Sequence, residues 1–444
     1  MSVPLLVLAE LDDRARAALG NRAEGLHAAA TAAVLPVLER IRRRGDEAVL
    51  EFLRDVDGVE TTADRLIVDD ATVAAAAASV PADLVGAMAH TVRNLERYHR
   101  AQLIDEFAIE VEPGVTVGER FPPVRAAGCY VPFGTAIYPS TALMLTTPAR
   151  VAGVARIVLA TGVDPATGEI PPAVIAAAAM GGATEIWRVS GTAAVAAWAY
   201  GTETLRPVDV IAGPGGPYVA AAKDLVRHRV GVDFEAGPSE VLVLALDEFD
   251  PDLAAADLIS EAEHGETSCG LVVTPDAAGA ARVAERLGVR LAALPADRRD
   301  AVLTQAAEGR TAIVVVADRA AAIAFSEQVA PEHVIVHATD PDEIARRLRC
   351  AGTVCIGAFT PSPAGSYVAG TNHVLPTGGA ARLSAGLSVT HFVRRQSFER
   401  ITREGLERLR PSIEAWATHE GLPGHLAAID ARLHPGMMPA PCSE

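Results

Sequence analysis

The feature that most constrains this chain is a regular alternation, from about Arg125 onward, of short β-branched runs with alanine-rich stretches of helical pattern. Such alternation is typical of parallel sheets covered by helices. The predicted strands are residues 156–161, 185–190 and 208–213, then 240–246, 270–275, 312–318, 333–338 and 353–358. Because the pattern pauses after the third strand and then restarts, the sequence predicts two α/β units.

The two ends of the chain differ from this body. The chain is mostly helical in pattern before Pro122, and it is helical again, and richer in charge, after about Ser388. Residues 359–387 form a predicted loop rich in Gly, Pro, Ser and Thr. Long ordered loops are more often functional than idle, so this loop is a candidate part of a site.

The net charge of the chain indicates which classes of partner it can bind. The 444 residues carry 39 basic and 56 acidic side chains, a formal net charge of −17. Phosphate backbones and anionic lipid heads repel such a surface, so we expect a small-molecule ligand, no nucleic acid and no membrane.

The five cysteines include no C-x-x-C pair, and the sequence shows no secretory signal and no apolar run of about eighteen residues. These features predict a cytoplasmic protein.

Two acid–imidazole pairs are candidates for chemistry. Glu261 and His264 stand at helical i, i+3 spacing, which places both on one face where they can share a metal. The alternative is a solvated Glu261 and a His264 that stabilises the helix end. Glu332 and His333 follow Pro331 at the start of a predicted strand, and they face one cleft if the backbone there is irregular. Otherwise they are a surface glutamate and a half-buried histidine.

Three further segments are weaker candidates by themselves. His373 lies in "GTNHVLPT" within the long loop, where a structural histidine explains it equally well. The segment "HEGLPGH" supplies Glu420 and His425. The segment "GPGGPY" has the strand-to-helix context of a phosphate loop but lacks the third glycine of the dinucleotide fingerprint, because Tyr218 occupies that place.

Taken together, these segments resemble the histidinol dehydrogenase family over nearly the whole chain. The similar segments, in order, are "RRRGDEAVLEFLRDVDG", "NLERYHRAQ", "GCYVPFGTAIYPSTALMLTTPARVAGV", "VDVIAGPGG", "AGPSEVLV", "EAEHG", "APEH", "AGTNHVLPT" and "HEGLPGH". The resemblance implies a homodimer with shared active sites. It also implies that zinc and NAD serve to oxidise a primary alcohol, through an aldehyde, to a carboxylate.

The resemblance also implies a role for individual residues. His333 is then the base that acts on the alcohol, and Glu332 activates the water that adds to the aldehyde. The other positions carried over are His264 and the partner subunit's His425 as zinc ligands, Ser239, His333 and Glu420 as substrate contacts, and Tyr130 beside the dinucleotide.

Four positions depart from the family pattern. Glu261 replaces a glutamine and Ser366 replaces a ligating aspartate, so one anionic oxygen ligand remains beside two imidazoles, a donor set that zinc accepts. We therefore predict Glu261, His264 and His425 as ligands, with Ser366 the least suited donor. Ala193 and Gly216 replace residues that contact NAD, and each replacement removes a hydrogen bond worth about 0.5–1.5 kcal/mol. The outcome is weaker NAD binding, a preference for NADP, or compensation by backbone contacts.

The replacement at Ser366, a predicted substrate contact, also removes an anion that would pair with a substrate ammonium group, a contact worth about 1.5–3 kcal/mol. The leading hypothesis is therefore a zinc-dependent, NAD- or NADP-linked dehydrogenase that acts on a primary alcohol other than histidinol. The alternatives are L-histidinol dehydrogenase of histidine biosynthesis, and a non-redox metal-binding homologue or hydrolase.

The predicted architecture is α/β, with two Rossmann-like parallel-sheet domains, one inserted in the other, and helical N- and C-terminal segments. Residues 25–129 and 238–387 form the first domain, which carries the zinc site. Residues 130–237 form the second domain on the side of the nicotinamide cofactor, and residues 388–444 form a helical segment that contributes to the partner's active site.

Overall fold

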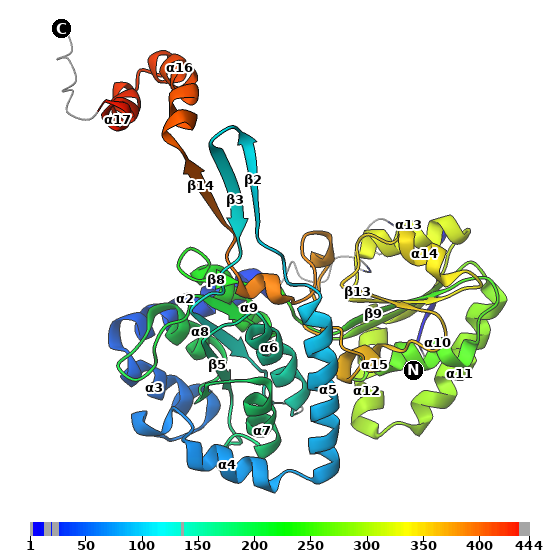
Figure 1. Cartoon of the computed structure of the whole chain (residues 1–444). Helices are drawn as coiled ribbons and strands as arrows, with labels where there is room; N and C mark the ends of the chain where they lie inside the picture. Colours follow the sequence, from blue (N-terminus) through cyan, green and yellow to red (C-terminus); the bar gives the residue numbers. More distant parts are fainter. Residues whose placement is uncertain (1–2, 13–18, 20–25, 135–136, 435–444) are drawn as a thin grey trace. The chain divides into compact units, whose positions relative to one another are not determined.

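The computed structural model describes residues 3–12, 19, 26–134 and 137–434 (Figure 1). The chain divides into two compact units. The first comprises Met1–Gln102 and Val124–Phe392, and the second comprises Leu103–Pro123 and Val393–Glu444.

The first unit contains a five-stranded parallel sheet in the order β6-β5-β4-β7-β8. Its strands are β4 (Ala126–Tyr130), β5 (Arg156–Thr161), β6 (Glu185–Arg188), β7 (Val210–Ala212) and β8 (Gly231–Val232). The connecting helices are α6 (Pro139–Val151), α7 (Pro172–Gly181), α8 (Gly191–Tyr200) and α9 (Pro217–Val226). The strands read as near-continuous apolar runs because helices cover both faces of such a sheet.

Four N-terminal helices pack around this sheet. They are α2 (Leu26–Arg44), α3 (Asp46–Asp57), α4 (Asp70–Ser79) and α5 (Ala82–Arg100). Helix α2 contacts α8 and α9, and its Leu38 and Ile41 share one core with Trp187 and Trp198. The predicted grouping of residues 25–129 with residues 238–387 in one domain stays a prediction. The apolar faces of these helices, and strand β4 itself, belong with the five-stranded sheet.

The first unit also contains a six-stranded parallel sheet in the order β1-β11-β10-β9-β12-β13. Its strands are β1 (Leu5–Val7), β9 (Glu240–Ala245), β10 (Cys269–Thr274), β11 (Ala312–Val315), β12 (His333–His337) and β13 (Thr353–Ile356). The accompanying helices are α10 (Pro251–Ala262), α11 (Ala277–Ala293), α12 (Ala296–Ala307), α13 (Arg319–Val329), α14 (Pro341–Arg347) and α15 (Ser362–Tyr367).

Side chains of β9 alternate between two cores, as the pleat of a strand requires. Val241 and Val243 pack with α10 and α11, whereas Leu242 and Leu244 pack with α13. The prediction of two Rossmann-like parallel sheets is therefore confirmed, together with all eight predicted strands. Strand β1 was not predicted, because three residues are too short for a periodicity to show.

The second unit is a three-stranded antiparallel sheet followed by two helices. Its elements are β2 (Phe107–Glu112), β3 (Val115–Arg120), β14 (Gln396–Ile401), α16 (Arg403–His419) and α17 (Pro423–Leu433), with strand order β14-β3-β2. The two helices agree with the predicted helical C-terminal segment, whereas the sheet was not predicted. Four short 3₁₀ turns complete the described chain: Leu8–Glu10, Ala63–Arg65, Ala380–Arg382 and Val389–Phe392.

No single helix in the described ranges is long and apolar enough to cross a membrane. Helices α4 and α5 pass the length and composition test as a pair, but a bend of 109° separates them.

Candidate active site

The Glu332 and His333 side chains come together where β12 begins. The Glu332 Oε2 atom lies 3.6 Å from the His333 Nδ1 atom, and both side chains are buried. Ala330, two residues before Glu332, has the left-handed backbone conformation with φ 48°, and Pro331 follows it. This irregular backbone precedes the regular strand, so the two adjacent side chains can approach each other instead of pointing to opposite faces.

Strand β9, the neighbour of β12, fixes both groups through one residue. The Glu240 backbone N–H donates to Glu332 Oε2 at 2.9 Å, and the His333 Nδ1–H donates to the Glu240 carbonyl at 3.3 Å. A carbonyl can only accept, so Nδ1 carries a proton and, in the neutral imidazole, Nε2 holds the lone pair. The arrangement leaves His333 Nε2 and Glu332 Oε1 for a ligand.

Burial and charge perturb both groups. Burial raises the pKa of the Glu332 carboxyl group, because the charged form loses its hydration. Burial alone would lower the pKa of His333, but the negative charges of Glu332 and Glu261 outweigh it and raise that pKa to about 9. Two titratable groups in one buried site, both with shifted pKa values, are typical of a catalytic centre.

Glu261 and His264 lie at the C-terminal end of α10. The His264 Nδ1 atom is 3.8 Å from Glu261 Oε2 and 3.1 Å from the Glu261 carbonyl oxygen, to which its N–H donates. Glu261 is 4% exposed, and its carboxylate pairs with the His264 ring at this distance of 3.8 Å. A buried carboxylate is costly unless a cation, hydrogen-bond donors or water satisfy it.

The structure leaves this pair short of a complete metal shell. Within the described ranges, no three His, Cys, Asp or Glu side chains are grouped closely enough to hold an ion. The Ser366 hydroxyl donates to the Ser362 carbonyl at 3.1 Å, within α15, and its place as a metal ligand stays a prediction. His425, the remaining predicted ligand, is an exposed residue of α17 in the second unit.

His373 joins the site, although sequence reasoning left its role open. Its Nδ1–H donates to the Ser366 carbonyl at 2.7 Å, and its Nε2 accepts from the Thr141 hydroxyl at 3.0 Å. Burial, together with the nearby His333, lowers the pKa of His373 to about 4. His373 is therefore a neutral imidazole with a fixed tautomer. Thr141 was missed, because nothing in the sequence shows that the first turn of α6 faces the long loop.

Ser239 and Glu420, the other predicted substrate contacts, lie in different units. Ser239 directly precedes β9, and its carbonyl accepts from the Cys269 N–H at 3.0 Å. It therefore adjoins Glu240, the residue that fixes Glu332 and His333. Glu420 caps the C-terminal end of α16 in the second unit, where its side chain is exposed.

The predicted cofactor residues lie at the carboxyl edge of the five-stranded sheet. The order of this sheet reverses direction between β4 and β7, and such switch points are where open α/β sheets bind ligands. Tyr130 ends β4 and is buried, which raises its pKa to about 12, and its hydroxyl accepts from the Gly191 N–H at 3.0 Å. Gly216 is exposed at the N-terminus of α9 and has free space around its Cα.

Ala193, the third predicted cofactor residue, is buried. Its side chain is 0% exposed and lies in the core of the five-stranded sheet. Its contact with the cofactor stays a prediction. The sequence could not show this burial, because the first turn of α8 is covered by other parts of the fold.

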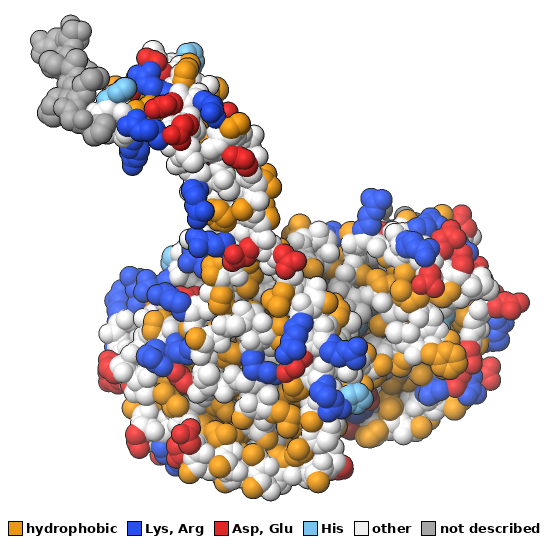
Figure 2. Space-filling view, viewed as in Figure 1, with side chains coloured by type: hydrophobic (Ala, Val, Ile, Leu, Met, Phe, Trp, Pro, Cys, Tyr) orange, Lys and Arg blue, Asp and Glu red, His pale blue; other side chains and the backbone are white. Residues whose placement is uncertain are grey.

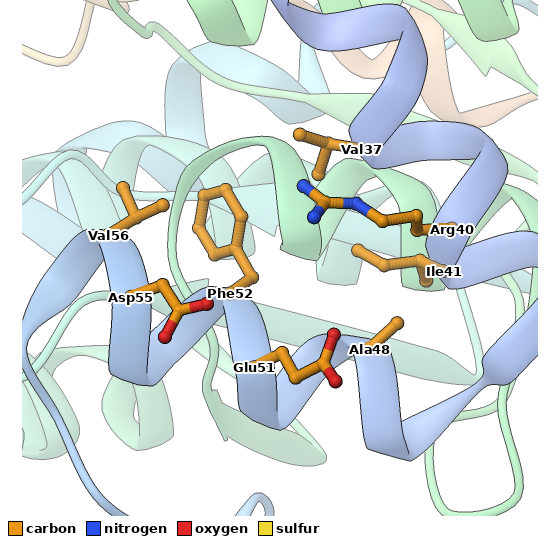
Figure 3. A pocket seen from close by; sticks show the side chains of 8 residues that line it. All are labelled: Val37, Arg40, Ile41, Ala48, Glu51, Phe52, Asp55 and Val56. Carbon is orange, nitrogen blue, oxygen red and sulfur yellow. The ribbon is translucent and has the colours of Figure 1, made fainter.

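A pocket elsewhere contains none of these groups. It lies between α2 and α3, and Figure 3 shows the Phe52 ring beside Val37 and the Arg40 side chain facing the pocket. Its lining residues are Val37, Arg40, Ile41, Ala48, Glu51, Phe52, Asp55 and Val56. The pocket is therefore separate from the candidate active site.

Comparisons with known proteins agree with this site. The family model described as histidinol dehydrogenase matches residues 21–433. The histidinol dehydrogenase of Cereibacter sphaeroides is 42% identical over 402 residues, which cover 90% of this chain and 92% of that protein. The histidinol dehydrogenase of Methanothermobacter thermautotrophicus is 40% identical over 401 residues, or 90% and 92% of the two chains.

A solved structure extends the likeness to the fold. The crystal structure of histidinol dehydrogenase from Elizabethkingia anophelis superimposes with a TM-score of 0.88 at 33% identity, over 97% of this chain and 98% of that one. The family match, the relatives and the fold thus agree, and this chain belongs to the histidinol dehydrogenase family.

Proposed function

We propose that this chain is a cytoplasmic L-histidinol dehydrogenase that oxidises the alcohol through the aldehyde to the carboxylate, with NAD as hydride acceptor. The observation that carries the proposal is the buried Glu332–His333 pair fixed by Glu240 beside the buried Glu261 carboxylate. The leading hypothesis from sequence was a different alcohol. The named relatives, at 40–42% identity, favour its histidinol alternative instead.

The donor chemistry of Glu261 and His264 fits a zinc ion. The Glu261 carboxylate is buried and lies 3.8 Å from His264 Nδ1. The His264 Nδ1–H bond to a carbonyl leaves the Nε2 lone pair for a metal, which is the usual arrangement of a metal-bound histidine. Bound zinc would supply a Lewis acid for the substrate's hydroxyl oxygen. Its charge would also offset the Glu261 charge that raises the pKa of His333, so that a neutral imidazole is favoured.

Two residues of the chain, His333 and Glu332, then each accept one proton during the reaction. His333 accepts the alcohol proton at Nε2, while its Nδ1–H bond to Glu240 holds the ring in place. Glu332 accepts a proton from the water that adds to the aldehyde, and its raised pKa makes the carboxylate a stronger base than an exposed glutamate. Burial of both groups limits the entry of other water.

The dinucleotide is proposed to bind at the carboxyl edge of β4 and β7, against Gly216 and the N-terminus of α9. The positive end of a helix dipole suits a pyrophosphate there. The N-terminus of α8 is less suitable, because the Tyr130 hydroxyl already accepts from Gly191 and the Asp57 carboxylate accepts from Ser190 nearby. NAD supplies the hydride acceptor, and NADP remains the alternative cofactor.

We further propose a homodimer in which the partner subunit's His425 completes the zinc shell and the partner subunit's Glu420 contacts the substrate. Two protein donors leave a zinc site incomplete, since three or four are usual. Support for this proposal comes from the two-donor pair in the first unit and from the exposure of His425 and Glu420.

A second candidate substrate follows from Ser366. Its hydroxyl is engaged with the Ser362 carbonyl and supplies no anion for a substrate ammonium group. A primary alcohol without that ammonium group would not need the anion. This candidate differs from histidinol in one measurable respect, namely the effect of the amino group on kcat/KM.

The test uses purified protein loaded with zinc, with NAD or NADP and a panel of primary alcohols that includes L-histidinol. We expect histidinol-dependent formation of NADH and histidine. The His333→Gln variant should lower kcat for the alcohol by about 10²–10⁴-fold, because it removes the proton acceptor. Histidinol turnover below that of another alcohol would favour the second candidate. Reduction of neither cofactor by any alcohol would contradict the proposal and favour a non-redox metal-binding homologue.

A further inference from the structure

The chain contains a single lysine, Lys223, among its 39 basic side chains. Lys223 lies in α9, and its side chain is 5% exposed. Arginine supplies every other cation of the sequence except histidine, yet the buried position carries lysine. An ammonium group is a compact charge with three donors, whereas guanidinium is a wide planar fork. The residue type thus indicates a small enclosed site that needs three hydrogen bonds in different directions.

The structure supplies those three partners. Lys223 Nζ donates to the Gly213 carbonyl at 3.0 Å and to the Phe234 carbonyl at 3.1 Å, and it forms an ion pair with Asp233. The Asp233 side chain is 0% exposed. A buried charge requires a partner and hydrogen bonds to offset its lost hydration, and this pair has both.

Together the two side chains hold both backbone groups of Gly213. While Lys223 binds its carbonyl, Asp233 Oδ2 accepts from its N–H at 2.8 Å. On the other side, a Cβ at Gly213 would lie 2.3 Å from the Tyr130 carbonyl oxygen, and the residue has a φ of +129°. The backbone of residue 213 is therefore held between the end of β4 and the ion pair.

The same pair joins two functional segments. Residues 213–216 lead to the exposed Gly216 at the N-terminus of α9, where the dinucleotide is proposed to bind. Residues 233–239 lead into β9, where Glu240 fixes Glu332. A further bond ties the segments to each other, since the Gly215 N–H donates to the Ala236 carbonyl at 3.0 Å.

We propose that Lys223 and Asp233 are a positioning pair that holds residues 213–216 in the conformation that binds the dinucleotide. The inference rests on the proposed function, because it assigns the pair to the cofactor side of that site. A pair that served the fold alone would affect thermal stability without a specific effect on cofactor affinity.

The first experiment compares two double variants of the full chain. Lys223→Met with Asp233→Asn removes both charges together, keeps the volume and leaves no lone buried charge. Arg227→Met with Asp224→Asn makes the same kind of change in an exposed pair at the end of α9, whose side chains are 58% and 42% exposed. We measure the Kd of NADH by fluorescence titration, bound zinc, and the thermal midpoint of each.

The first double variant should bind NADH at least about tenfold more weakly and show a higher KM for NAD than the parent, with zinc content retained. The exposed pair should leave the NADH Kd unchanged. A folded Lys223–Asp233 variant with the parent's NADH Kd overturns the inference while the proposed function stands. A parent protein that binds no NADH overturns both.

The second experiment needs no variant, so it decides the matter if the first double variant does not fold. Lys223 is the sole lysine, so an amine-acylating reagent labels the side chain at this one position, with the N-terminal amine as an internal reference. Because Lys223 holds the Gly213 carbonyl of the segment to which the dinucleotide is proposed to bind, NADH should stabilise the buried position of Lys223. Saturating NADH should therefore slow acylation of Lys223 several-fold and leave the N-terminal amine unaffected. Equal rates with and without NADH overturn the inference.

Discussion

At the scale of single residues, the Glu332 and His333 side chains lie next to each other but form different hydrogen bonds with the backbone. His333 Nδ1 is tied to a carbonyl, so the ring has one free nitrogen, whereas Glu332 has one oxygen bound to a backbone N–H and one left over. A fixed imidazole suits a proton acceptor at a defined atom. A half-bound carboxylate of raised pKa suits the activation of water.

This difference predicts that substitution of His333 mainly slows oxidation of the alcohol and that substitution of Glu332 mainly slows oxidation of the aldehyde. Glu332→Gln keeps the shape and can still accept from the Glu240 N–H, but it cannot take a proton from water. We expect oxidation of the aldehyde to slow by about 10²–10⁴-fold, with a much smaller effect on oxidation of the alcohol. Initial rates measured separately from the alcohol and from the aldehyde check this. Equal losses in both steps would show that Glu332 does not act on water in particular.

His373 predicts an acid-labile contribution to stability. Its pKa is about 4 in the folded protein, below the ordinary value of about 6.5, so the unfolded chain binds more protons between these pH values. The contribution is complete above about pH 6.5 and is lost as pH falls towards 4. By about pH 5 the loss is about 2 kcal/mol, since a tenfold change in proton affinity corresponds to about 1.4 kcal/mol.

Urea unfolding at about pH 7 and about pH 5 measures this effect. His373→Gln retains a donor and an acceptor but does not titrate, so its free energy of unfolding should fall less over the same interval. A parent and variant with the same pH dependence would show that His373 is not the source.

The sequence pointed to the two candidate pairs but not to their surroundings. Glu261 with His264, and Glu332 with His333, are near neighbours in the chain, so spacing and the family resemblance suffice to find them. The Thr141–His373 contact and the burial of Ala193 depend on which helix covers which loop. Such packing has no local signature, and so these features emerge from the structure alone.

At the scale of elements, α10 is the helix that carries the proposed zinc ligand. One turn before Glu261, the buried Asp257 carboxylate accepts from His337 Nε2 of β12 at 2.7 Å. Asp257 and Glu261 are four residues apart and lie on the same face of the helix. The Asp257–His337 contact therefore ties that face of α10 to the strand that begins with His333.

We predict that Asp257→Leu lowers the free energy of unfolding by about 1–3 kcal/mol, because it removes the acceptor and leaves the buried His337 unsatisfied. Asp257→Leu combined with His337→Phe should recover part of the loss, since no unpaired polar group remains. Chemical denaturation of the variants and a double-mutant cycle measure this coupling.

Glu39→Gln, in the exposed Glu39–Arg42 pair, is the matched surface control, with an expected change within about 0.5 kcal/mol. If Asp257→Leu is as mild as this control, the buried contact does not hold α10 in place.

Eight of the parallel strands could be predicted because each is a short apolar run that helices bury on both faces, whereas β1, β4 and β8 were not predicted. The antiparallel strands could not, because "FAIEVE" and "QSFERI" mix charged and apolar residues, and β14 pairs with β3 from a distant part of the sequence. Their pairing depends on tertiary folding rather than on composition.

At the scale of the whole molecule, the second unit exposes several large apolar side chains. Phe107, Ile109 and Val111 alternate along β2 and are 46%, 52% and 56% exposed, and Trp416 of α16 is 66% exposed. Hydrophobic side chains are visible on the surface of this unit in Figure 2. Exposed apolar groups of this size are typical of an interaction surface, which agrees with the proposed dimer.

Mixed dimers test whether active sites are shared between subunits. Glu332→Gln and His425→Ala remove groups that, in the proposal, meet from opposite subunits, so each variant alone should have little activity for the complete oxidation. In a mixed dimer one site carries both substitutions and the other carries neither. Random mixing makes half of the dimers mixed, so co-expression should restore about a quarter of the parent activity.

Co-expression of Glu332→Gln with His333→Gln is the matched control. Both residues belong to the same half of a site, so every site in the mixed dimer carries one substitution and no activity should return. Recovery in the control as well would point to subunit stabilisation rather than to shared sites. Full activity of His425→Ala alone would contradict the shared site directly, since the zinc shell would then be complete without the partner subunit's imidazole.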